Sequence, residues 1–95
     1  WGIILPTLND VIFIDSYPKL DLHGFDRESA RVAITDFIRD QVKLKQSIVT
    51  IVHGRGTGVL KETCHQVLKR NKSVLDFKTF YNNPGCTIVL LYVDE

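Results

Sequence analysis

Three glycines at alternate positions, Gly54, Gly56 and Gly58, separate a run of apolar residues from an amphipathic segment. Every residue of the run, Ile48–Val52, is β-branched, and Thr50 is its one polar residue. This pattern predicts a strand that is buried on both faces. The segment after the glycines repeats its apolar residues at helical spacing. These residues are Leu60, Cys64, Val67 and Leu68, with Asn71 at the end of the stripe. The chain must therefore contain a strand–loop–helix unit whose loop tolerates positive φ.

The remaining elements are predicted from the same kinds of pattern. Residues 19–23 alternate in polarity and end at Gly24, which predicts a half-buried strand. Asp26 is a suitable N-cap for a helix. That helix carries an apolar stripe at Ala30, Ala33, Ile34, Phe37 and Ile38. Residues 74–81 predict a third strand, residues 82–85 a turn and residues 86–93 a fourth strand.

The order strand–helix–strand–helix–strand–strand predicts an α/β (α+β) fold with right-handed crossovers and an antiparallel last pair. The final strand is apolar on both faces, so we expect it inside the sheet. Ninety-five residues suffice for one domain, which we assign to residues 19–95. Residues 1–18 are expected to be an N-terminal extension, in which Val11–Ile14 could form an extra strand. Because the sequence contains no Met, we expect it to be part of a longer chain or a trimmed one.

Composition limits the cellular setting. The chain is 44% hydrophobic and 24% charged, and no apolar run is long enough to cross a bilayer, so we expect no membrane association. No export signal precedes the two cysteines, Cys64 and Cys86, which favours reduced thiols in a cytoplasmic protein. Cys64 lies on the apolar helix stripe, and no zinc-ligand spacing is present, so we predict no structural metal site.

Positive charge is concentrated in one segment. Residues 53–72 contain five Lys or Arg and one Glu, a net charge of +4, whereas the whole chain carries +1. This distribution favours an anionic partner, although a solvated helix face gives the same pattern.

A glycine-rich loop between a strand and a helix is a plausible anion site, because main-chain N–H groups point outward beside the positive end of the helix dipole. The spacing fits neither the nucleotide P-loop nor the dinucleotide fingerprint. A tight turn without a ligand is the alternative explanation of the three glycines.

Two histidines, His23 and His53, each follow a predicted parallel strand and each precede a glycine. Because ligands bind at the carboxyl ends of such strands, we expect both imidazoles at one edge of the sheet, with Asp21 beside His23. A carboxylate, two imidazoles and a phosphate-binding turn would then line one rim.

The two motifs together resemble the Smr (small MutS-related) domain family. Residues 20–24, LDLHG, are similar to the family's first motif, and residues 53–61, HGRGTGVLK, to its second motif, with the resemblance extending over about residues 19–93. It implies a fold like the C-terminal domain of a translation initiation factor, with two helices on one face of a mixed sheet in the order 1-2-4-3. Where the family often has a glycine-rich stretch before its last strand, this chain has Asn82-Asn83-Pro84-Gly85.

Members of the family are endonucleases, some joined to MutS-like ATPases and others acting on messenger RNA at stalled ribosomes. The resemblance therefore implies that Asp21 and His23 are catalytic, and that His53, Gly54, Gly56 and Gly58 contact the nucleic-acid backbone. Our own hypothesis adds His53 as a catalytic partner of His23, and Arg55, Thr57 and Lys61 as further nucleic-acid contacts beside the glycines.

We hypothesise cleavage of phosphodiester bonds in RNA or DNA. The 2′-OH of RNA needs no metal, whereas attack by water on DNA would use a divalent ion, Mg²⁺ or Mn²⁺, held by Asp21. The alternative is a non-catalytic module that binds structured RNA, branched DNA or the ribosome. We expect a monomer or a weak homodimer formed through residues 3–5 and 11–14.

Overall fold

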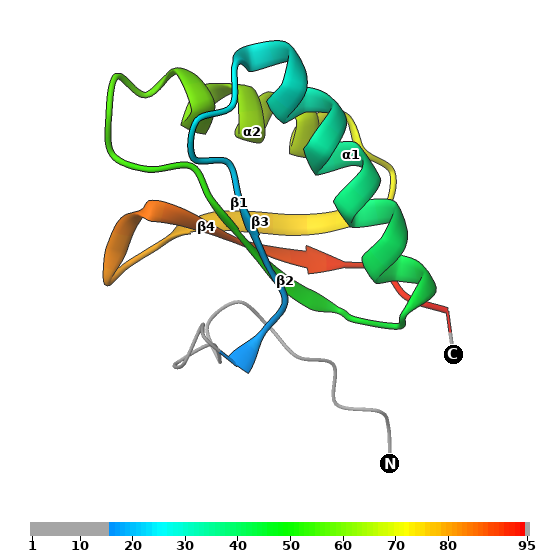
Figure 1. Cartoon of the computed structure of the whole chain (residues 1–95). Helices are drawn as coiled ribbons and strands as arrows, with labels where there is room; N and C mark the ends of the chain where they lie inside the picture. Colours follow the sequence, from blue (N-terminus) through cyan, green and yellow to red (C-terminus); the bar gives the residue numbers. More distant parts are fainter. Residues whose placement is uncertain (1–15, 95) are drawn as a thin grey trace.

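The computed structural model describes residues 16–94, which form a four-stranded sheet covered on one face by two helices (Figure 1). The sheet order is β1-β2-β4-β3, with β1 parallel to β2 and β4 antiparallel to both of its neighbours. This topology confirms the predicted fold. The elements are β1 (Lys19–Asp21), α1 (Arg27–Lys43), β2 (Ile48–Val52), α2 (Val59–Arg70), β3 (Val74–Phe80) and β4 (Asn83–Leu91).

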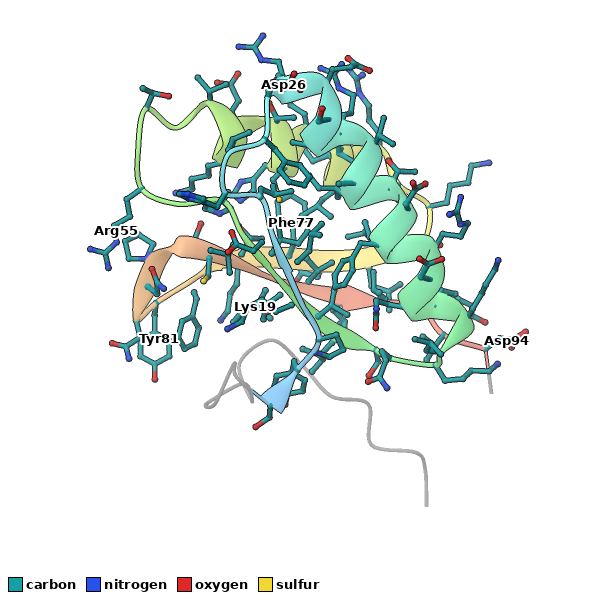
Figure 2. The ribbon with its side chains drawn as sticks, in the orientation of Figure 1. Lys19, Asp26, Arg55, Phe77, Tyr81 and Asp94 are labelled. Carbon is teal, nitrogen blue, oxygen red and sulfur yellow. The ribbon has the colours of Figure 1, made fainter. Side chains whose placement is uncertain are left out.

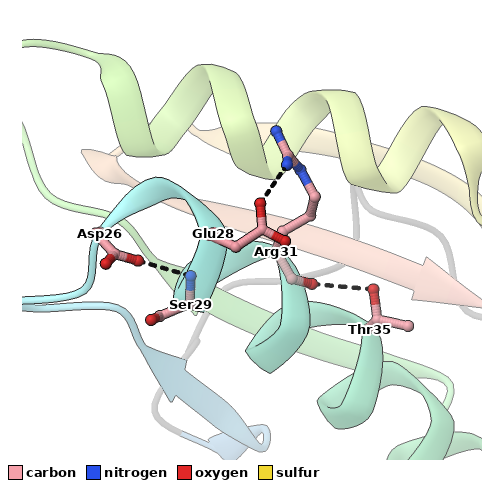
Figure 3. A network of polar contacts seen from close by, with 5 residues as sticks. All are labelled: Asp26, Glu28, Ser29, Arg31 and Thr35. Atoms are coloured by element: carbon pink, nitrogen blue, oxygen red, sulfur yellow. Dashed lines mark hydrogen bonds and ion pairs between the residues drawn. The ribbon is translucent and has the colours of Figure 1, made fainter.

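Helix α1 begins where the sequence predicts, because the carboxylate of Asp26 accepts a hydrogen bond from Ser29 N at 2.7 Å (Figure 3). One turn later, Arg31 forms an ion pair with Glu28 at 2.8 Å, and Thr35 Oγ1 donates to the Arg31 carbonyl. The apolar stripe faces the sheet: Ala30, Ile34 and Ile38 are buried.

Side chains of alternate sheet residues enter two separate clusters. The cluster between the sheet and the helices includes Leu22, Val49, Ile51, Val89 and Leu91 from the sheet side. The cluster on the other face of the sheet contains Ile48, Phe80, Cys86 and Ile88, with Tyr17, Val52 and Leu90 packed against it. Both faces of β2 and β4 are therefore buried, which explains why these strands are mostly apolar and occupy the centre of the sheet.

Several strand boundaries differ from the sequence prediction, since β3 ends at Phe80 rather than at residue 81 and β4 ends at Leu91 rather than at residue 93. Strand β1 ends at Asp21 rather than His23, because the carboxylate of Asp21 accepts a hydrogen bond from His23 N at 2.9 Å and turns the chain. The predicted turn over residues 82–85 is shorter: β4 already begins at Asn83. Pro84 is accommodated because β4 extends past its last pairing with β2, at Cys86, and a register shift separates Thr79 from Phe80 in β3.

The extra strand expected at Val11–Ile14 and the apolar segment at residues 3–5 lie outside the described residues. Within residues 16–94, no helix is long and apolar enough to cross a membrane.

Candidate nucleic-acid interface

The loop from β2 to α2 forms a hollow at the end of the sheet. Gly54 and Gly58 both adopt positive φ, 82° and 87°, which only glycine does without strain. The hollow has a volume of about 320 Å³. It is lined by Gly54, Arg55, Gly56, Thr57, Gly58, Lys61 and Pro84. All six residues for which the sequence predicts nucleic-acid contact therefore line one surface depression, and Arg55 projects outward from it (Figure 2).

The loop is tied to the start of β4. The carbonyl of Gly85 accepts hydrogen bonds from His53 N at 2.9 Å and Gly54 N at 3.0 Å. A Cβ at Gly85 would lie 3.3 Å from the Cα of Gly54, which is tighter than most Cβ contacts. Glycine at position 85 therefore allows β4 and the loop to approach each other closely. The sequence analysis missed this role of Gly85, although the Pro84–Gly85 pair lies where the family has its glycine-rich stretch.

Main-chain donors in the loop have no acceptor within the described part of the protein. Among the residues that the structure describes, the N–H groups of residues 55–58 donate to none. Helix α2 begins at Gly58 without a side-chain cap, so its positive end also points at this loop. With the cationic side chains of Arg55 and Lys61 on the rim, the hollow has the donors and the charge that an anion requires.

His53 lies beneath the loop and is buried, with 6% of its surface exposed. Its Nδ1 lies 3.1 Å from the carbonyl oxygen of Gly54, and its Nε2 lies 2.8 Å from Thr87 Oγ1. Burial lowers the pKa of His53 below its usual value of 6.5, opposed by the Gly54 carbonyl and assisted by the charge of Lys61. Both ring nitrogens are engaged, so His53 supports the loop from below.

A second histidine shares the same hydroxyl. His65, on α2, places Nε2 2.9 Å from Thr87 Oγ1, and its ring lies 6.0 Å from that of His53. The sequence analysis did not assign His65 or Thr87 to the site. No local signal marks Thr87, which is a polar residue within an otherwise apolar strand.

Asp21 and His23 are exposed at the end of β1. In the register of the sheet, Asp21 pairs with Val52, whose side chain packs against the cluster on the helix-free face. Leu22 and His53 directly follow β1 and β2, and their side chains lie on the helix-covered face. Leu22 belongs to the cluster beneath the helices, and the ring of His53 contacts His65 on α2. Asp21 and the ring of His53 therefore project from opposite faces of the sheet, and neither Asp21 nor His23 lines the hollow.

The other described residues offer neither a metal site nor a reactive thiol. Within residues 16–94, no three His, Cys, Asp or Glu side chains are grouped so that they could hold a metal ion. Burial raises the pKa of Cys64 to about 12, which makes this thiol a poor nucleophile.

The Smr domain model matches residues 20–92 of this sequence, which include every predicted site residue. The chain belongs to the Smr domain family. Endonuclease MutS2 of Streptococcus suis is 39% identical over 74 residues, covering 75% of this chain and 10% of that protein. Endonuclease MutS2 of Staphylococcus aureus is 38% identical over 60 residues, covering 63% of this chain and 8% of that protein.

Solved structures agree with the Smr assignment. The Smr domain of Thermus thermophilus MutS2 has a TM-score of 0.77 and 27% identity, covering 79% of this chain and 98% of that one. YdaL of Escherichia coli, a stand-alone small MutS-related protein, has a TM-score of 0.75 at 22% identity, covering 79% and 66%, and shows the same fold. This Smr domain spans about a tenth of the length of the curated MutS2 relatives.

Proposed function

We propose that this Smr domain is an endonuclease that cleaves phosphodiester bonds in RNA or DNA. The observation that carries the proposal is the hollow at the start of α2. It has a volume of about 320 Å³, large enough for a phosphate, and it is lined by two cationic side chains and by residues 55–58, whose N–H groups donate to none of the described residues. The relationship to proteins named endonuclease MutS2 supports the same reaction class.

In this proposal, the loop binds one phosphate and stabilises the charge that develops on it. The N–H groups of Gly56–Gly58 act as donors, and Arg55 and Lys61 add positive charge. The donors are held by the two hydrogen bonds to Gly85 and by His53 beneath the loop, so they need little rearrangement when the phosphate arrives. We assign His53 a positioning role in the catalytic site, because both of its ring nitrogens are already engaged.

The exposed residues Asp21 and His23 carry out proton transfer in this proposal. His23 acts as general base or acid, and Asp21, which already accepts from His23 N, fixes the turn that presents the imidazole. On RNA, the 2′-OH next to the bound phosphate is the nucleophile. On DNA, water would be the nucleophile. A divalent ion such as Mg²⁺ or Mn²⁺ would be held by Asp21 together with the phosphate itself, because the described residues offer no group of three ligands, and it would make that water more acidic.

Matched single-stranded RNA and DNA substrates, each with and without EDTA, test the proposal. We expect His23→Gln to lower the cleavage rate by at least about a hundredfold, the usual loss for a general acid or base. Asp21→Asn keeps an oxygen that accepts from His23 N but removes the carboxylate charge, so we expect it to lower the rate mainly on DNA. Asp36→Asn is the matched control, because Asp36 is an exposed carboxylate on α1 whose ion pair among the described residues is with Arg39. Equal rates for Asp21→Asn, His23→Gln and the control would refute the catalytic assignment.

A non-catalytic binding module is the second candidate. It is favoured by the placement of Asp21 and His53 on opposite faces of the sheet, so that the three predicted catalytic residues do not surround one cavity. In that case Arg55→Gln weakens binding of nucleic acid, Arg39→Gln on α1 does not, and no cleavage product tracks with the purified protein.

A further inference from the structure

A second groove continues from the loop hollow along α2. It has a volume of about 430 Å³ and shares Gly58 and Lys61 with the first. Its lining consists of Gly58, Lys61, Glu62, His65, Gln66 and Lys69. Lys61, His65 and Lys69 are spaced by four residues, so they form one row on the helix surface.

The hydrogen bonds of the two histidines fix which nitrogen of His65 carries a proton. The carbonyl of Gly54 only accepts, so His53 Nδ1 must be the donor and Nε2 of the neutral ring must be the acceptor. Thr87 therefore donates its hydroxyl proton to His53 Nε2 and accepts at Oγ1 from His65 Nε2. Neutral His65 then has its lone pair on Nδ1, which bonds to no described residue.

The surroundings of His65 favour this neutral form. Burial lowers its pKa below 6.5, and His53 when protonated and the charges of Lys61 and Lys69 lower it further. From the sheet it meets Thr87 on β4 and the ring of Phe77 on β3, with centroids 5.0 Å apart, and neither is charged. The carboxylate in the groove, Glu62, accepts a hydrogen bond from Gln66 at 3.3 Å.

We propose that this groove is a second phosphate site for the nucleic-acid strand, and that His65 takes up a proton at Nδ1 when the strand binds. The inference rests on the proposed function for the class of ligand, a phosphodiester chain. A phosphate in the row is flanked by Lys61 and Lys69, and it compensates the positive charge that otherwise opposes protonation of His65. The protonated ring then donates from Nδ1 to a phosphate oxygen and from Nε2 to Thr87.

Proton uptake makes binding depend on pH in a defined direction. The bound form of His65 has a higher pKa than the free form, so affinity increases as the pH falls from the bound-state value to the free-state value. If the phosphate raises the pKa by about one unit, affinity rises about tenfold over that interval.

The test uses a short 2′-O-methylated oligoribonucleotide in EDTA, which lacks both the 2′-OH nucleophile and a metal ion. Nitrogen-15 NMR of the imidazole rings follows each histidine from about pH 5 to 8, with and without saturating oligonucleotide. We expect Nε2–H as the neutral tautomer of His65 and a higher titration midpoint in the complex. His65→Gln should bind without the pH dependence of affinity, whereas Arg39→Gln, an exposed change on α1, should retain it.

Salt dependence tests the second phosphate contact. Lys69→Gln should reduce the slope of log affinity against log salt by about one, whereas Lys43→Gln, the same charge change on α1, should leave it unchanged. A His65 midpoint that does not move on saturation, equal slopes for the two lysine variants, or no binding of the oligonucleotide each overturns the inference. Proton uptake on binding by a domain that cuts no substrate would instead refute the endonuclease and leave the groove assignment intact.

Discussion

Thr87→Val tests the buried connection between β4, the loop and α2. The hydroxyl of Thr87 is fully buried and meets two ring nitrogens, His53 Nε2 at 2.8 Å and His65 Nε2 at 2.9 Å. Valine has nearly the same shape but cannot form either hydrogen bond. Each bond contributes about 1 kcal/mol, and His53 Nε2 is then left without a partner in a residue that is 6% exposed.

These contributions predict a loss of about 2–3 kcal/mol in the free energy of unfolding. For a domain of this size, that loss lowers Tm by roughly 10–20 °C. Urea unfolding followed by circular dichroism, together with thermal scans, measures both quantities. A second variant, Thr87→Ser, keeps the hydroxyl and should recover most of the loss.

Thr79→Val is the matched control. Thr79 lies directly across from Thr87 in the register of β3 and β4, on the same face of the sheet, and its hydroxyl bonds to none of the described residues. We expect its free energy of unfolding to change by less than about 0.5 kcal/mol. If Thr87→Val is no more destabilising than Thr79→Val, the hydroxyl does not join the two imidazoles, and the tautomer argument for His65 fails with it.

Three further outcomes follow from the same structure. Folding lowers the pKa of His53 and His65, so their contribution to stability is complete above pH 6.5 and is lost as the pH falls below it; urea midpoints across this range should decrease toward acid. With its pKa raised to about 12, Cys64 should resist a thiol reagent in the native protein and react once urea unfolds the chain. Gly58→Ala should cost about 1 kcal/mol of unfolding free energy because of its positive φ, whereas Gly56→Ala, with open space and no such φ, should cost almost nothing.

The interior position of β4 could be predicted from its own residues, whereas the full order of the sheet was implied by the resemblance to the Smr family. Cys86–Leu91 is almost entirely apolar, and the structure shows why: Thr87 and Val89 face the helices, while Ile88 and Leu90 face the opposite side. A strand with two buried faces has to lie inside the sheet. Its beginning was harder to predict, because Asn82–Gly85 has the composition of a turn. In the structure, Asn83 pairs with Phe80 of β3, and Gly85 accepts hydrogen bonds from the loop.

The anion-binding loop could also be predicted from the sequence, because its N–H donors belong to consecutive residues and its glycines permit the conformation of the loop. The residues that support the loop from β4 and α2 could not be predicted from the sequence. Thr87 reaches His53 because β2 pairs with β4, although the two residues are 34 positions apart in the sequence. His65 reaches the same hydroxyl because α2 packs on the sheet. In the sequence, His65 is one polar residue on a helix, and Thr87 is one small residue in a strand.

The relative orientation of the two motifs depends on a single residue of register. Because Asp21 pairs with Val52 rather than with His53, the carboxylate and the second imidazole alternate to opposite faces, although both motifs end at the same edge of the sheet. The sequence cannot reveal this offset, since a shift by one residue would reverse it. In the proposed function, the strand must therefore cross the edge formed by the ends of β1 and β2, with its phosphate held by the loop and its cleaved bond beside His23. An endonuclease built in this way depends on the exposed turn after β1, not on the buried imidazole of His53, for the proton that moves.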